Sequence, residues 1–167
     1  KEDKYTNAIL RMAMLSSMSQ AQAKLAKTDK DAAARMGEDI AKEFRRMTSE
    51  FKPADLTNFI CVQVGNYEVS YAQRLKDQAL RNEEANTALS YFEQAISRGG
   101  EYLDEARIGK ASALGLTDDK AKQAESAQLF EQLASSPKQE IAGPALFGLT
   151  QLHMDMGNAA EAVACAK

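Results

Sequence analysis

Hydrophobic positions along the chain recur every three or four residues, the spacing that places side chains on one face of an α-helix. The clearest case lies between residues 31 and 51, where six apolar positions form one stripe: Ala33, Met36, Ile40, Phe44, Met47 and Phe51. From about residue 5 to residue 26 a weaker pattern places Ile9, Met12, Leu15 and Leu25 among alanines. These patterns predict two N-terminal helices, separated by KTDKD at 27–31, where an Asp can cap the second.

Residues 59–71 support two interpretations. β-Branched and aromatic side chains flank Gly65-Asn66, which is typical of a β-hairpin. The same stretch also continues a helical stripe that consists of Leu56, Ile60, Val64, Tyr67, Tyr71 and Leu75. An isolated hairpin in an otherwise helical chain would have no sheet to join, so we expect a helix.

Turn signals divide the rest of the chain into further helices. Separators are expected at RGG (98–100), TDDK (117–120), SSPKQ (135–139) and Gly157-Asn158, and RNEEAN (81–86) is expected to open a helix. Thr117 or Asp118 could cap the helix that follows TDDK, and Pro144 indicates either a helix start or a kink. Only 9 Gly and 3 Pro occur in 167 residues, which leaves few turns. We predict an all-α fold of about seven to eight helices in one continuous domain, residues 1–167.

Two parts of the pattern repeat along the chain. YFEQAIS at 91–97 is echoed by LFEQLAS at 129–135, so that Phe92 and Phe130 are 38 positions apart. Apolar–glycine pairs recur at intervals of 44 and 39 positions, at Val64-Gly65, Ile108-Gly109 and Phe147-Gly148. A period of about 40 residues with two helices per unit predicts an α-solenoid of antiparallel helical hairpins, because one hairpin cannot bury its own apolar face.

These residues resemble the tetratricopeptide repeat (TPR) family over about residues 55–167. In that family the first helix of a unit carries an apolar–glycine pair that lets its partner approach closely, and the second carries small, aromatic and small residues. The second pattern is matched by Ala88, Phe92 and Ala95, by Ser126, Phe130 and Leu133, and in part by Ala162 and Ala166. The units are longer than the family's usual length of about 34 residues. We predict a helical hairpin over residues 1–52, packed on TPR-like repeats over residues 53–167.

The resemblance implies a non-enzymatic scaffold that binds a peptide or a partner helix in a concave groove. Candidate partner-binding residues are Tyr67, Tyr71 and Arg74 on the third helix, with Lys110 and Gln151 on later ones. Tyrosine and arginine combine apolar area with hydrogen-bonding tips, which suits them to interfaces. An alternative interpretation places both tyrosines in the core.

The family also contains membrane-anchored bacterial proteins of envelope assembly or chaperoning, which suggests a second hypothesis. The chain could be a structural module of such an assembly and form a homo-oligomer, because the final helix AAEAVACAK has a small apolar face that no later helix in this chain covers. The absence of Met before Lys1 fits an anchor or signal ahead of the chain, and equally a trimmed segment. The compartment stays open, with the bacterial periplasm favoured over the cytoplasm.

Patterns typical of other functions are missing from the sequence. His153 is the only histidine, and Glu83-Glu84 and Asp118-Asp119 are explained by helix capping, because each pair falls in the first turn of a predicted helix. Cys61 and Cys165 form no C-x-x-C pair. We therefore expect no enzyme activity, no cofactor and no metal.

Charge and hydropathy narrow the range of partners. The formal net charge is −3, and basic residues are mixed with acids, so the chain offers no basic face for nucleic acid. No apolar run approaches the roughly 20 residues that are needed to cross a bilayer. We expect a protein or peptide partner, no nucleic acid and no membrane insertion by this segment.

Overall fold

The computed structural model describes the backbone of residues 2–165, and side-chain burial for residues 6–47 and 49–165. Residues 2–165 contain no strand and are mostly helical, so the all-α prediction is confirmed. The eight α-helices and one 3₁₀ turn of this part are α1 (Glu2–Leu25), α2 (Lys30–Glu50), η1 (Pro53–Asp55), α3 (Asn58–Ala72), α4 (Gln78–Arg98), α5 (Leu103–Leu116), α6 (Lys120–Ala134), α7 (Gln139–Asp155) and α8 (Ala159–Cys165).

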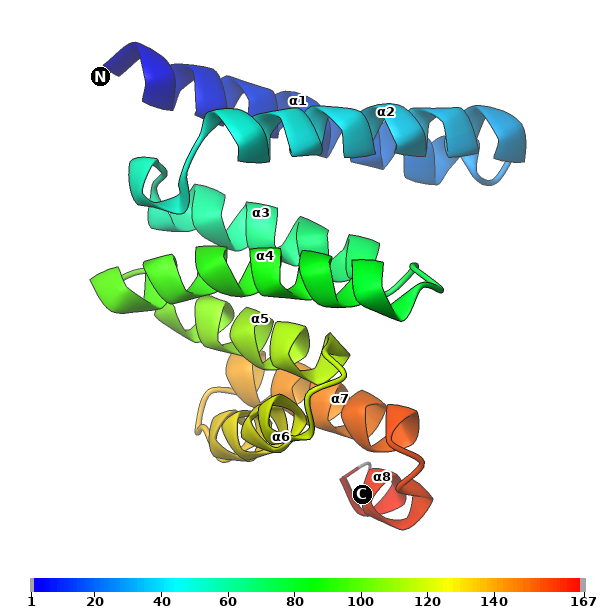
Figure 1. Cartoon of the computed structure of the whole chain (residues 1–167), viewed down its shortest axis with the longest axis vertical. Helices are drawn as coiled ribbons and strands as arrows, with labels where there is room; N and C mark the ends of the chain where they lie inside the picture. The colour runs from blue at the N-terminus through cyan, green and yellow to red at the C-terminus, as the bar shows by residue number, and fades with distance from the viewer. Residues whose placement is uncertain (1, 166–167) are drawn as a thin grey trace.

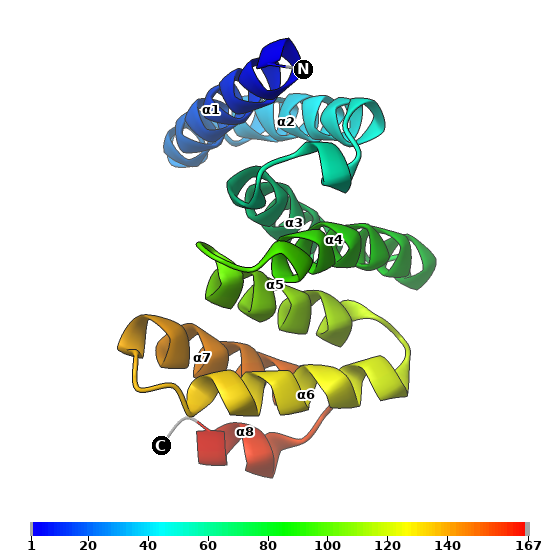
Figure 2. The same ribbon diagram turned by 90° about the vertical axis from the view of Figure 1, so that its left-hand side faces the viewer.

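The helices pack consecutively along the chain. Figures 1 and 2 show an elongated stack, with α1 and α2 at one end and α8 at the other. Each helix from α4 to α8 packs on the one before it, and α3 also contacts α5, as α5 contacts α7. Helices α3, α5 and α7 therefore form a series in which each helix contacts the next.

Residues 59–71 lie within α3, so the helix interpretation is confirmed and the hairpin alternative is wrong. The Thr57 hydroxyl caps this helix by accepting a hydrogen bond from the Ile60 N–H at 3.4 Å. Ile60 and Val64 are buried, because α3 is packed against both α4 and α5. This packing outweighs the preference of β-branched residues for strands.

Aspartate side chains cap three of the helices. Asp29 caps α2, Asp77 caps α4 and Asp119 caps α6, each by accepting bonds from backbone N–H groups of the first turn. The prediction that Thr117 or Asp118 caps α6 is therefore wrong. Thr117 instead ends α5, where its buried hydroxyl donates to the Leu114 carbonyl at 2.8 Å.

Two other expected boundaries also differ. Because Asp77 starts α4 earlier than predicted, Glu83 and Glu84 fall beyond its first turn, and the explanation of this pair as capping residues is wrong. Helix α7 continues through Pro144 from Gln139 to Asp155, so the alternative helix start at Pro144 is also wrong. Pro144 has no backbone N–H, so the Glu140 carbonyl four residues earlier lacks its usual hydrogen bond within the helix.

Two clusters of buried side chains form the core. The larger cluster draws on α1 to α5 and includes most of the apolar stripe of α2, and the smaller one draws on α5 to α7 around Phe130. On α1 the buried positions are Ala8, Met12 and Leu15, whereas Ile9 is exposed. The sequence pattern of α1 thus identified the helix but only part of its buried face.

The glycines of the apolar–glycine pairs lie against the two repeated phenylalanines. The Phe92 ring is fully buried between Gly65 of α3 and Gly109 of α5, and the Phe130 ring lies against Gly148 of α7. A Cβ atom at Gly109 would lie 2.2 Å from the Phe92 ring. Glycine is therefore required for the close approach of these helices. Of the small residues in the repeated motif, Ala88, Ala95, Ser126 and Ala162 are buried, and Ala166 lies outside the described residues.

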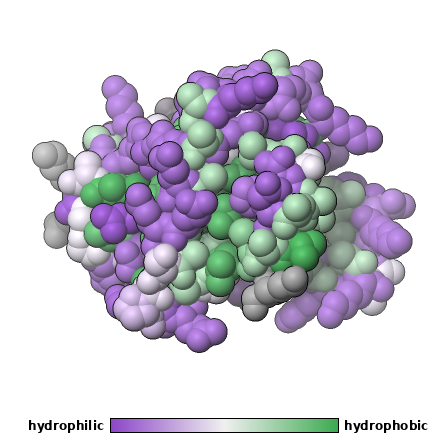
Figure 3. All heavy atoms as spheres, turned by 90° about the horizontal axis from the view of Figure 1, so that it is seen from below, coloured by the Kyte–Doolittle hydropathy of each residue, from purple (hydrophilic) through white to green (hydrophobic). Residues whose placement is uncertain are grey.

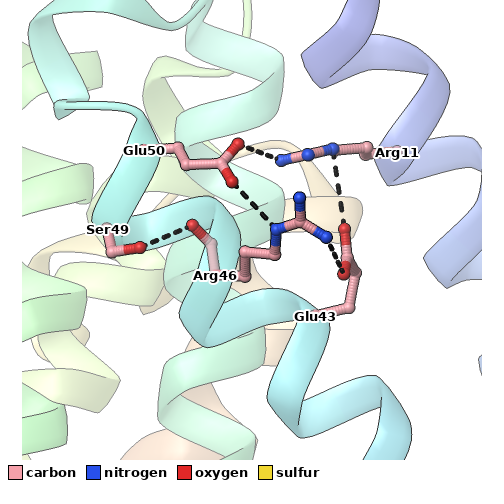
Figure 4. Close-up of polar contacts among 5 residues, drawn as sticks. All are labelled: Arg11, Glu43, Arg46, Ser49 and Glu50. Carbon is pink, nitrogen blue, oxygen red and sulfur yellow. Dashed lines mark hydrogen bonds and ion pairs between the residues drawn. The ribbon is translucent and has the colours of Figure 1, made fainter.

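An ionic network joins α1 to α2 at one end of the stack (Figure 4). The Arg11 guanidinium of α1 contacts Glu50 at 2.5 Å and Glu43 at 3.5 Å, both on α2. Arg46 also contacts Glu50, at 2.9 Å, and the two arginines hold the pKa of this carboxyl below its usual range. The network links α1 to α2 through charged side chains, beside the buried contacts between the two helices.

Candidate functional site

Tyr67 and Tyr71 lie on the side of α3 that faces α2, and both are half-buried. The Tyr67 ring stacks on Phe44 of α2, with 3.5 Å between ring centroids and 8° between ring planes. Burial raises the pKa of Tyr67 to about 12, so its hydroxyl stays protonated at neutral pH. Tyr67 therefore contributes to the packing between α2 and α3.

Tyr71 adds a polar contact between the same helices. Its hydroxyl accepts a hydrogen bond from Arg45 Nη1 at 3.0 Å, and the Arg45 guanidinium carbon lies 5.4 Å from the centre of the Tyr71 ring. This hydrogen bond raises the pKa of Arg45. The Tyr71 ring is also parallel to Tyr67 at 6.4 Å, so three aromatic rings form a row from α2 across α3.

Beside this row, residues of α1, α2 and α3 line an open groove of about 350 Å³, which we call the N-terminal groove. Its floor is apolar and buried, and consists of Met12, Leu15, Ile40 and Phe44. Its rim is polar and includes Ser16 and Ser19 of α1 and Asn66, Ser70 and Arg74 of α3. Arg74 is the one charged side chain among the described residues that line it.

The other two candidate residues lie elsewhere. Lys110 of α5 bridges Glu125 of α6 at 3.0 Å and Glu93 of α4 at 3.7 Å, so its charge already has partners within the stack. Gln151 of α7 is exposed and donates to Asp155 at 3.0 Å, on the wall of a second groove. The structure thus brings Tyr67, Tyr71 and Arg74 together, and leaves Lys110 and Gln151 apart from them.

The α1 side of the N-terminal groove was not predicted. Ser16 and Ser19 are small polar residues on a helix with a weak apolar stripe, and nothing in their spacing indicates which face meets α3. The signal that could have pointed to them is the run of serines between Leu15 and Gln20, because such a run is a poor choice for a buried helix face.

A buried carboxyl group was also missed. Glu68 of α3 is only 2% exposed and shares a hydrogen bond with Glu84 of α4. Burial, with the nearby Glu84 charge, raises the pKa of Glu68 to about 8. Glu68 therefore keeps its proton at neutral pH. A glutamate between Tyr67 and Val69 on an otherwise apolar helix was a sequence signal for such a group.

Residues with reactive chemistry are isolated from one another. Burial raises the pKa of the Cys61 thiol to about 11, which makes a nucleophilic thiolate scarce at neutral pH. His153 is half-buried, and its Nδ1 has no hydrogen-bond partner among the described residues. Among the side chains that the structure describes, no three of His, Cys, Asp or Glu are grouped closely enough to hold a metal ion.

Hydropathy along the helices gives one further result. In the part of the chain that the structure describes, no helix has both the length and the apolar character that crossing a bilayer requires. Comparison of the chain with models of known protein families, with curated proteins and with solved structures found no match.

Proposed function

We propose that this chain is a non-enzymatic scaffold for protein interactions, built as an α-solenoid of TPR-like helical hairpins. The recurring contact between glycine and phenylalanine supports this proposal: Phe92 lies between Gly65 and Gly109, and Phe130 lies against Gly148. The contacts of α3 with α5 and of α5 with α7 support it as well. Stacked units of this kind offer a partner an extended and fairly rigid surface.

The N-terminal groove is the proposed binding site for a peptide or a partner helix. The observation that carries this assignment is its construction, with a buried apolar floor from α1 and α2 below an exposed polar rim from α1 and α3. An apolar floor accepts an apolar side chain of the ligand, and the rim groups fix its orientation. Arg74 favours a ligand with an acidic group at that end of the groove.

Site-specific photo-crosslinking tests this site. A photoreactive residue is placed at Ser70, which is exposed on the groove rim, or at the control position Glu131, which is exposed on α6 outside the groove. After irradiation in an extract of the source cells, we expect a discrete protein adduct from Ser70 only. An added Arg74→Glu substitution should remove that adduct while the helical circular dichroism signal stays unchanged.

Two results would refute the groove assignment. One is the same set of adducts from the Ser70 and Glu131 positions, which would indicate contact without a defined site. The other is an adduct at Ser70 that persists at full yield with Arg74→Glu. Since Arg74 is exposed, its substitution should leave the fold intact, and loss of the helical signal would point to a structural role instead.

A second candidate function is a structural module that self-associates within a membrane-anchored bacterial envelope assembly or chaperone-type complex. Apolar side chains exposed at the two ends of the stack favour it. On α1, Leu10 is 64% exposed beside the exposed Ile9 and Met14, and on α8 Val163 is 57% exposed. Figure 3 looks onto the α8 end and shows hydrophobic atoms gathered among hydrophilic ones.

Sedimentation velocity over a range of concentrations tests self-association. We expect oligomers whose fraction rises with concentration and falls when Leu10 is replaced by glutamate, because a charge at an apolar contact carries a large desolvation cost. The control is Lys24→Glu, at an exposed position on the same helix. This substitution changes the net charge more than Leu10→Glu does, but it leaves the apolar surface unchanged. A strict monomer at every concentration, or equal effects of both variants, would rule out this function.

A further inference from the structure

A second groove, larger than the N-terminal groove, has none of Tyr67, Tyr71 and Arg74 in its lining. It has a volume of about 850 Å³ and is bordered by the end of α3, the start of α4, the connection from α5 to α6, and α7. These parts of the ribbon lie toward the right-hand side of Figure 1. We call this second groove the glutamine groove, because four glutamines line it beside two exposed apolar residues: Gln73, Gln78, Gln123, Gln151, Phe147 and Met156. It shares no lining residue with the N-terminal groove.

Hydrogen bonds between its walls hold this groove in shape. Asn82 of α4 accepts a bond from the Asp118 N–H at 2.9 Å, and the Gln123 amide donates to the Thr117 carbonyl at 2.7 Å. Arg81, also on α4, donates to the Leu75 carbonyl at 2.6 Å and so ties the connection between α3 and α4 to α4. The connections that border the groove are thus tied to α4 and α6, so a ligand would find the walls already in place.

One side of the groove exposes a large aromatic side chain. Phe147 is 74% exposed in the middle of α7, although the next residue, Gly148, is packed against Phe130. Met156, at the end of the same helix, is 44% exposed. A phenylalanine held on a packed helix and left in water loses the benefit of burial, and a ligand that covers it would recover that benefit.

The polar lining is suited to an uncharged ligand. Its four charged residues balance, since Arg81 and Lys120 are opposed by Asp118 and Asp155. The glutamine side chains supply both amide N–H donors and carbonyl acceptors, which match the two polar groups of a peptide main chain. The Gln73 side chain is exposed and makes no hydrogen bond with any described residue, and its carboxamide is therefore available to a ligand.

We infer that the glutamine groove binds an extended, uncharged segment of polypeptide, with an apolar side chain packed on Phe147 and Met156. An extended segment leaves its main-chain N–H and C=O groups open to the carboxamides, whereas a helix has already paired them within itself. This site adds to the scaffold function proposed above and does not depend on occupation of the N-terminal groove.

The test selects ligands from a library of random linear peptides displayed on phage and panned against the whole chain. We expect enriched peptides that are poor in charge and carry an apolar residue. Their affinity should fall about tenfold for Phe147→Ser and for Gln151→Leu, in keeping with the loss of a main anchor. Both residues are exposed, so the two variants should fold, and circular dichroism confirms it. Side-chain amide signals of the glutamines should shift in nitrogen–proton spectra when a selected peptide is added.

Arg74→Glu is the control that separates this site from the N-terminal groove. Selected peptides should bind this variant with unchanged affinity, and should lose binding when their main-chain amides are methylated. Peptides that lose affinity only with Arg74→Glu would place recognition in the N-terminal groove and overturn this inference. So would selected peptides that bind as helices, that tolerate main-chain methylation or that bind Phe147→Ser normally, and so would a selection that enriches nothing.

Discussion

Glu68 is the residue whose environment departs most from what its chemistry favours. It is buried between α3 and α4 beside a second carboxyl group, Glu84, and near the hydroxyl-bearing rings of Tyr67 and Tyr91. The Arg45 cation lowers the pKa of Glu68, but this effect is smaller than that of burial. A carboxyl group in such a place favours its neutral form, in which it donates a hydrogen bond to its neighbour.

This arrangement predicts that the chain loses stability as pH rises. The pKa of Glu68 is about 8 in the fold and 4.5 as the ordinary value, so between these limits the folded state keeps a proton that the unfolded state releases. The free energy of unfolding should therefore decrease from about pH 4.5 to about pH 8 and then level off. Glu68→Gln keeps the hydrogen-bond donor and cannot ionise. It should be more stable than the wild type by at least about 1 kcal/mol at pH 8, and near equal at pH 4.5.

Urea denaturation at several pH values measures this difference. Glu83→Gln serves as control, because Glu83 is an exposed neighbour on the same helix as Glu84 and its variant should follow the wild-type curve. If the difference between Glu68→Gln and the wild type does not grow with pH, Glu68 does not hold its proton in the folded state.

At the scale of the element, the two repeated motifs were informative because one supplies a phenylalanine ring and the other supplies the glycines that leave room for it. The spacing of Phe92 and of the glycines predicts close contacts between helices, and the structure places Gly65 and Gly109 against that ring. Glycine in a helix costs about 1 kcal/mol relative to alanine, so its recurrence beside an apolar residue signals a packing requirement.

Other features of the elements were only partly predictable from the sequence. The spacing at 59–71 fits both a strand and a helix, and the correct helix prediction depended on the absence of a sheet that a hairpin could join. Asp119 rather than Asp118 caps α6 because the first free backbone N–H groups of the helix lie within its reach. Two adjacent aspartates in the sequence do not show which of them has that position. The two grooves join side chains from three or more helices, so they depend on how the helices stack, and local pattern carries no information on that.

The close approach of α4 and α5 gives a prediction at this scale. Gly109→Ala puts a methyl group against the buried Phe92 ring and should destabilise the fold by about 1–3 kcal/mol. Gly143→Ala is the matched control, since no atom lies within 4 Å of the added Cβ and the helix should gain up to about 1 kcal/mol. Thermal and urea unfolding measure both. Phe92→Leu should cost less in the Gly109→Ala background than alone, and equal costs would show that the methyl group and the ring do not compete for space.

For the whole molecule, the main question is whether the stack unfolds as one unit. The two core clusters meet at α5, which places Ala113 and Leu114 in the larger one and Ala111 in the smaller one. Because most contacts join a helix to its neighbours in the chain, a local loss of packing has few routes to the far end. Stability should then vary along the stack, in segments that open separately.

Two matched substitutions test this, one in each cluster. Phe44→Leu and Phe130→Leu each shorten a buried phenylalanine, and each should cost on the order of 1–2 kcal/mol. In native-state hydrogen exchange, Phe44→Leu should lower protection in α1 to α3 and leave α6 and α7 near wild type, and Phe130→Leu should do the reverse. The linkage through α5 predicts that this helix responds to both. If either variant lowers protection evenly from α1 to α7, the stack opens as a single unit, and the rigidity of one groove is then tied to the stability of the other.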